Sequence, residues 1–199
     1  MYRTLIIFVL ILLPLYTYAN VEDAYKRSYS YEKRQDYENA IKSIMPVYKQ
    51  YPMGYTVNLR LGWLFYLKKA YANSISHYNK AIQALPVSVP PKLGYTLPLI
   101  AQQKWAQAEQ VLNQILKSDY YNYLANVRLS YVLRMQGKFE LAARVSQKML
   151  TFYPIDTTFL AEFALSKIAL GDTEGAKLIL NDILILDPEN ITARSILKK

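Results

Sequence analysis

The feature that most constrains the fold of this 199-residue chain is a repetition with a period of 34 residues. A small residue recurs at each step, without insertion or deletion, at Ala40, Ser74, Ala108, Ala142 and Ala176. Three residues earlier the chain has Tyr37, Tyr71, Trp105 and Phe139, and Thr173 in the last copy. A fixed period gives every copy the same neighbours, so it indicates that one structural unit is stacked on copies of itself.

Each unit contains the signals of two helices and a stop. Residues 56–68 and 71–85, for instance, both have apolar residues at helical spacing, and a short polar turn joins them. Proline, which disfavours the continuation of a helix, follows the second stretch in every unit but the third. It stands at Pro52, Pro86, Pro154 and Pro188, and Tyr120 takes its place in the third unit.

These columns resemble the tetratricopeptide repeat, a helix-turn-helix unit of the same length. The resemblance covers five consecutive units, 21–54, 55–88, 89–122, 123–156 and 157–190, and leaves residues 191–199 as a short C-terminal capping helix. It implies an all-α fold in which residues 20–199 form one right-handed α-solenoid. Stacking of neighbouring units supplies the stability, and five units exceed the roughly three that are needed.

A second small-residue column lies in the first helix of each unit: Ser28, Gly62, Thr96, Ser130 and Ala164. Glycine costs a helix about 1 kcal/mol relative to alanine, so Gly62 needs a structural reason. We expect the two helices of the second unit to cross where Gly62 meets Ser74. Phe65, Tyr71 and Tyr78 are expected to fill the sides of this crossing.

The third unit is irregular because it opens with the proline-rich stretch "PVSVPPKLGYTLPL". Pro98 removes one backbone hydrogen bond and tends to kink a helix. We therefore expect a bent or irregular first helix between Pro90 and Ala101. Such a bend is a candidate hinge between the first two and the last two units.

The N-terminus has the layout of a secretory signal peptide. Arg3 precedes an apolar run from Leu5 to Leu13, and small residues end the segment before a cleavage point after Ala19. Nine apolar residues fall short of the roughly 20 that cross a bilayer, although an uncleaved anchor is the alternative. The chain has no cysteine, so disulfides and thiolate metal sites are excluded. We expect residues 1–19 to be removed and the mature chain to be exported, to the periplasm of a bacterium.

In a stack of this kind the first helices line the concave surface, and residues facing away from the small-residue column are free to bind a partner. Their spacing of three and four residues keeps them on one stripe of each helix. The predicted groove consists of Tyr25, Tyr29, Leu59, Trp63, Tyr66, Leu93, Leu97, Val127, Tyr131 and Arg134. Tyrosine and tryptophan are frequent anchors in interfaces, so this stripe favours a protein or peptide segment as the partner. The alternative is that these side chains only pack against the adjacent repeat.

Positive charge is concentrated in the second and third units, because residues 39–108 contain no aspartate or glutamate. The predicted basic surface consists of Lys42, Lys49, Arg60, Lys68, Lys69, Lys80, Lys92 and Lys104. A surface of one charge sign attracts anionic partners, an acidic protein segment among them. The alternative is that these lysines and arginine form only a solvated face that keeps the protein soluble. No nucleic-acid-binding motif is present, and export makes nucleic acid an unsuitable partner.

Residues that could support catalysis are few. The only histidine, His77, has no second histidine or cysteine with which to form a metal site, and we expect it to be an ordinary surface residue of its helix. No phosphate-binding loop, nucleophile elbow or catalytic carboxylate pair is found. We therefore expect a protein without enzymatic activity, cofactor or metal.

The sequence leads to two hypotheses about function. The first is a non-enzymatic adaptor that binds a protein segment in its concave groove during assembly of a bacterial envelope complex; membrane contact then comes only through the signal segment or that complex. The second is a module that binds an anionic polysaccharide or cell-wall glycan through the basic, aromatic surface of the second and third units. The chaperone-binding clamp known in this family is missing, because Tyr25 and Tyr29 stand where lysine and asparagine are required.

Overall fold

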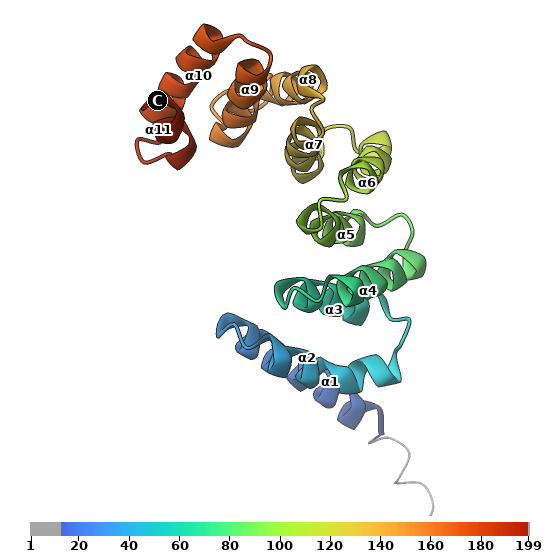
Figure 1. Cartoon of the computed structure of the whole chain (residues 1–199). Coiled ribbons are helices and arrows are strands. Elements are labelled where there is room, and N and C mark those ends of the chain that lie inside the picture. Colours follow the sequence, from blue (N-terminus) through green and yellow to red (C-terminus); the bar gives the residue numbers. More distant parts are fainter. Residues whose placement is uncertain (1–12, 199) are drawn as a thin grey trace, which may run out of the picture. The chain divides into compact units, whose positions relative to one another are not determined.

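The computed structural model describes the backbone of residues 13–198 and the side chains of residues 20–198 (Figure 1). Within this range all regular elements are helices, so the predicted all-α fold is confirmed. The first helix begins at Leu13 and continues past Ala19 to Lys33. The predicted signal peptide otherwise lies outside the described residues, and its cleavage stays a prediction. No helix in the described part of the chain is both long enough and apolar enough to span a membrane.

The helices alternate as first and second members of five hairpins and end with one short helix. The first members are α1 (Leu13–Lys33), α3 (Tyr55–Leu67), α5 (Val89–Ala101), α7 (Tyr123–Met135) and α9 (Thr157–Ala169). The second members are α2 (Tyr37–Gln50), α4 (Tyr71–Ala84), α6 (Trp105–Ser118), α8 (Phe139–Leu150) and α10 (Thr173–Leu186). The last helix is α11 (Ile191–Leu197).

The 34-residue period of the sequence is also the period of the helices. The aromatic column from Tyr37 to Phe139 supplies the first residue of four second helices. The small-residue column from Ala40 to Ala176 is fully buried in all five hairpins. In the hairpins α1–α2, α3–α4, α7–α8 and α9–α10, alanine or serine at these positions allows the two helices to approach closely.

Four of the five second helices, α2, α4, α6 and α10, end at the same point of the repeat whether or not proline follows, and α8 ends two residues earlier. α4 ends at Ala84, two residues before Pro86, and α6 ends at Ser118, two residues before Tyr120. In both helices the cap residue's N–H still bonds to a carbonyl of the last turn. Proline therefore marks the helix end in this chain but is not needed for it.

The chain divides into two compact units, and the boundary in the sequence lies between Pro98 and Leu99. Unit 1 contains α1 to α4 and most of α5, and unit 2 contains the end of α5 and α6 to α11. α5 is an uninterrupted helix with Pro98 inside it, so the expectation of an irregular helix was wrong in this respect. Only the last turn follows Pro98, and the loss of one hydrogen bond there leaves the rest of the helix intact. A hinge at this position stays a prediction.

The predicted crossing of α3 and α4 is confirmed. The Ser74 hydroxyl donates a hydrogen bond to the carbonyl of Gly62 at 2.7 Å. The buried ring of Tyr78 lies against Gly62, where an added Cβ would stand 2.7 Å from the ring. Gly94 of α5 lies against the same ring, and a Cβ there would stand 2.2 Å from it. Gly62 and Gly94 thus make room for one tyrosine between α3 and α5.

Two buried asparagines, which the sequence analysis did not single out, fasten the turns between repeats. The Asn58 amide donates to the carbonyls of Pro52 and Gly54 at 2.9 and 2.8 Å. The Asn126 amide donates in the same way to the carbonyls of Tyr120 and Asn122, at 3.1 and 2.9 Å. Each amide therefore holds the turn that precedes its own helix.

Candidate functional site

A groove with a volume of about 520 Å³ lies between α1 and α3 in unit 1. Its walls come from one side of each helix, and we call it the α1–α3 groove. The lining residues are Tyr25, Tyr29, Glu32, Lys33, Thr56, Leu59, Arg60 and Trp63. Four of them, Tyr25, Tyr29, Leu59 and Trp63, belong to the partner-binding stripe that the sequence predicts.

Glu32 is the polar centre of this groove. One of its carboxylate oxygens accepts a hydrogen bond from the indole N–H of Trp63 at 2.6 Å, and the other forms an ion pair with Arg60. The Arg60 guanidinium also donates to the hydroxyl of Ser28, at 3.1 and 3.0 Å. Both oxygens of Glu32 are therefore occupied, and the Trp63 ring is held in one orientation before any partner arrives.

Arg60 does not belong to an exposed basic surface, so this part of the prediction was wrong. Its relative exposure is 6%, and its guanidinium lies 3.8 Å from the centre of the Tyr29 ring. A buried arginine needs an anionic partner, which Glu32 provides from the preceding repeat. The sequence pattern shows the charge of a residue but not the partner that neutralises it.

The two tyrosines of α1 differ in their surroundings. Tyr29 is 51% exposed even though Arg60 covers one face of its ring. Tyr25 is partly buried, and this burial, reinforced by the nearby Tyr29, raises the pKa of Tyr25 to about 12. The Tyr25 phenol is therefore a neutral hydrogen-bond donor at physiological pH, and Tyr29 offers the more accessible ring.

The other predicted groove residues of unit 1 lie outside the α1–α3 groove. Tyr66 is partly buried, and its ring centre lies 5.7 Å from that of Trp63 and 6.2 Å from that of Tyr71. It extends the aromatic surface along α3. Leu93 and Leu97 of α5 are also partly buried and do not line this groove.

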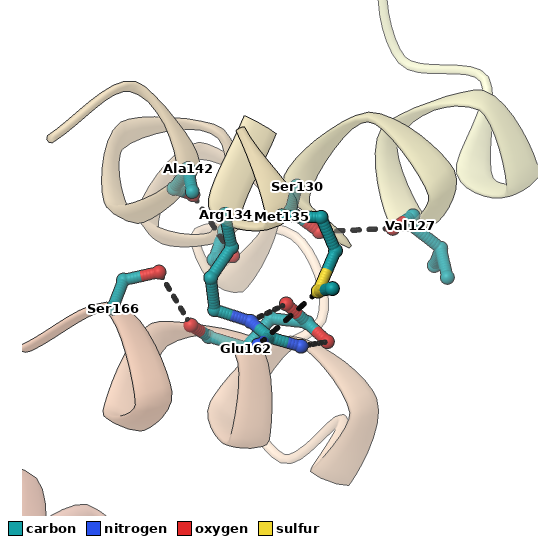
Figure 2. Close-up of polar contacts among 8 residues, drawn as sticks. Val127, Ser130, Arg134, Met135, Ala142, Glu162 and Ser166 are labelled. Carbon is teal, nitrogen blue, oxygen red and sulfur yellow. Dashed lines mark hydrogen bonds and ion pairs between the residues drawn. The ribbon is translucent and has the colours of Figure 1, made fainter. Parts of the chain in front are cut away.

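The predicted residues of unit 2 are partly buried along α7. The Arg134 guanidinium forms two hydrogen bonds with the Glu162 carboxylate of α9, at 2.8 and 3.1 Å (Figure 2). The rings of Tyr131 and Trp105 make a T-shaped contact, with 6.0 Å between their centres. Val127 accepts a hydrogen bond from Ser130 at its carbonyl. The Arg134 side chain therefore forms a contact between the fourth and fifth repeats.

The lysines of the predicted basic surface fall into two groups. Lys42 and Lys68 both approach Glu38, and Lys80 bonds to the hydroxyl of Tyr48, so much of their charge is balanced or covered. The other lysines have no ion-pair partner among the residues described. They are Lys49, Lys69, Lys92 and Lys104. The positive charge is therefore less continuous than its clustering in the sequence predicts.

His77 is buried, so its predicted place on the surface was wrong. Its relative exposure is 8%, its ring stacks on Phe65 at 5.3 Å, and Nδ1 lies 2.9 Å from the side-chain oxygen of Asn58. Burial lowers the pKa of His77 to about 4, and the charge of Lys80 adds to this effect. His77 is therefore a neutral core residue of the second repeat.

Comparison with known proteins supports the same fold. The family model described as "Tetratricopeptide repeat" matches residues 25–89 and 99–154. No curated protein sequence matches the chain.

Several solved structures are similar to the chain in fold, at low sequence identity. MamA from Desulfovibrio magneticus RS-1 aligns with a TM-score of 0.77 and 12% identity over 86% of this chain and 97% of that one. YrrB, described as a TPR protein with an unusual peptide-binding site, aligns with a TM-score of 0.72 and 13% identity, covering 86% and 89%. PilW, described as a type IV pilus biogenesis factor, aligns with a TM-score of 0.71 and 21% identity, covering 81% and 74%.

Proposed function

Because the chain belongs to the tetratricopeptide-repeat family and has the fold of a protein-interaction scaffold, we propose that its α1–α3 groove binds a segment of another protein, without catalysis. The observation that carries this proposal is the fixed position of Trp63. Its indole is held by Glu32, and Glu32 is held in turn by Arg60. An aromatic anchor that is ordered in advance loses little conformational entropy when a partner binds.

The dimensions of the groove favour a short stretch of chain as its ligand. A volume of about 520 Å³ holds a few side chains and not a folded domain. Tyr25, Tyr29, Leu59 and Trp63 offer mainly apolar and aromatic contacts, so the segment should present one or more apolar side chains to them. Lys33 at the rim has no ion-pair partner among the described residues, and it suits an acidic group beside the apolar anchor.

The cellular role follows from the predicted export of the chain. An exported scaffold with a preformed groove suits the assembly of a bacterial envelope complex in the periplasm. YrrB and PilW, named above, are described as peptide-binding and as a pilus biogenesis factor, and they are consistent with such a role. The alternative of an anionic glycan as ligand is less favoured, because Arg60 is buried and Glu38 balances Lys42 and Lys68.

A capture experiment tests the proposal. Envelope proteins from the native host are passed over the immobilised chain, and the retained proteins are compared with those retained by Trp63→Ala. Phe152→Ala is the matched control, because Phe152 is an exposed aromatic residue of unit 2 that does not line the groove. We expect a partner that Phe152→Ala retains and Trp63→Ala loses. A set of partners unaffected by Trp63→Ala would mean that the groove is not the binding site.

A further inference from the structure

Unit 2 has a second groove, which the sequence analysis did not foresee. It has a volume of about 900 Å³, and its lining residues come from α6, α7 and α8 and from Tyr120 between α6 and α7. Its floor is apolar and consists of Leu116, Leu129, Leu133, Leu141 and Val145. We call it the outer groove, because α6 and α8 are second helices of their hairpins and lie on the outer side of unit 2 (Figure 1).

The rim of the outer groove is basic. Glu109 lies on the rim, but Lys138 and Gln136 both donate to its carboxylate at 2.7 Å, so its charge is compensated. Lys148 donates to the side chain of Asn126 at 2.6 Å. Two exposed cations remain, Lys117 and Arg144, and neither has an ion-pair partner in the described part of the chain. An apolar floor with this rim suits a helix that has apolar side chains and a carboxylate on one face.

The chain itself has such a helix. On α10, Leu178 is 70% exposed and Ile185 is 78% exposed. Asp182 lies between them in the sequence, is exposed, and forms no ion pair with any described residue. The spacing of four and three residues places all three side chains on one stripe of the helix. We call this the α10 stripe.

The positions of the two surfaces allow a closed assembly. The α10 stripe belongs to the next second helix after α8, and both helices lie on the outer side of the same unit (Figure 1). A two-fold axis that places α10 of one copy on the outer groove of a second copy also places the second α10 on the first groove. Such an interface is self-complementary and stops at a dimer.

We propose that the outer groove receives α10 of a second copy of this chain and that the protein is a symmetric dimer. Leu178 and Ile185 enter the apolar floor, and Asp182 pairs with the basic rim at Arg144. The α1–α3 groove belongs to unit 1 and contributes no residue to this interface, so this inference does not rest on the partner proposed above.

Sedimentation equilibrium of the full chain, expressed with its own N-terminus, measures the association directly. We expect a dimer with a dissociation constant of about 10 µM or tighter, as for other specific interfaces of moderate size. Leu178→Asp combined with Ile185→Asp should weaken the dimer by about a hundred-fold or more, because two charges would face an apolar floor. Val87→Asp, a change at an exposed apolar residue of unit 1, should leave it unchanged.

A charge reversal tests the predicted pair of residues. Arg144→Glu and Asp182→Arg should each weaken the dimer by about ten-fold, and the two changes in one chain should restore most of the affinity. A wild-type chain that is monomeric at about 100 µM would overturn the proposal. So would a dimer that survives the double aspartate variant, or charge changes whose effects simply add.

Discussion

Glu32 and Arg60 form an ion pair between the first and second repeats, and the same two positions of the repeat carry the opposite charges between the fourth and fifth. There the pair is Arg134 and Glu162, three repeats further along the chain. Both pairs span 28 residues and join consecutive first helices, α1 to α3 and α7 to α9. These two positions therefore accept an ion pair of either polarity, and in the middle repeats they are not both charged.

This relationship predicts the outcome of a charge reversal. Arg60→Glu should lower the free energy of unfolding by about 3 kcal/mol, because it leaves two carboxylates in a largely buried contact. Glu32→Arg together with Arg60→Glu should recover at least half of this loss. Full recovery is not expected, since the Trp63 indole loses its acceptor. Urea unfolding followed by circular dichroism measures the effect, and a double variant no more stable than Arg60→Glu would contradict it.

The sequence predicted the repeat and the helices well because both depend on one periodic pattern. The contact of Gly62 with Ser74 could be predicted, since it is a local crossing within one hairpin. The pairing of Arg60 with Glu32 could not be predicted. The repeat pattern shows which residues occupy equivalent positions, but it does not show which charged side chains of neighbouring repeats contact each other. His77 was misplaced for a similar reason. Its burial depends on Phe65 and Asn58 of the other helix of its hairpin.

Because the ring of Tyr78 lies against Gly62 and Gly94, we expect a larger side chain at Gly62 to lower the stability of the fold. Gly62→Leu should lower the free energy of unfolding by about 1 to 3 kcal/mol, because the side chain would collide with the ring of Tyr78. Ala72→Leu, an exposed position on α4, is the control and should change stability by about 0.5 kcal/mol or less. Thermal unfolding measures both. A Gly62→Leu variant as stable as the control would show that the crossing is not tightly packed.

Because His77 is buried, we expect the protein to lose stability in mild acid. The pKa of His77 is about 4 in the folded chain and about 6.5 when unfolded, so between these values the unfolded state binds the additional proton. Stability should therefore fall as the pH drops from 6.5 to 4, by about 2 kcal/mol after allowance for solvent screening.

The contribution of His77 is isolated by comparison with His77→Gln, which keeps a polar side chain near Asn58 but does not titrate. The difference in unfolding free energy between the two proteins should depend on pH between 4 and 6.5 and be constant above this range. Parallel stability curves for the two proteins over the whole range would contradict the assignment.

Partner binding through the α1–α3 groove should depend on Trp63 more than on any single lysine. Trp63→Ala should weaken binding of the captured partner by about 2 kcal/mol or more while the helical content is unchanged, because it removes a preoriented aromatic anchor. Glu32→Gln should have a smaller effect, since an amide oxygen still accepts from the indole but no longer pairs with Arg60. Isothermal titration calorimetry with the purified partner measures both, and normal binding by Trp63→Ala would contradict the groove model.

The response to salt separates apolar binding in the groove from binding by the lysines. At about 0.5 M salt the Debye length falls to about 4 Å, so attraction between exposed charges is largely screened. Contacts with Tyr29, Leu59 and Trp63 bury apolar surface and should keep most of their affinity under these conditions. We therefore expect the dissociation constant to change by less than about ten-fold between 0.1 and 0.5 M salt. A much larger loss, reproduced when Lys49 and Lys69 are replaced by alanine, would identify an anionic ligand held by the basic residues of unit 1.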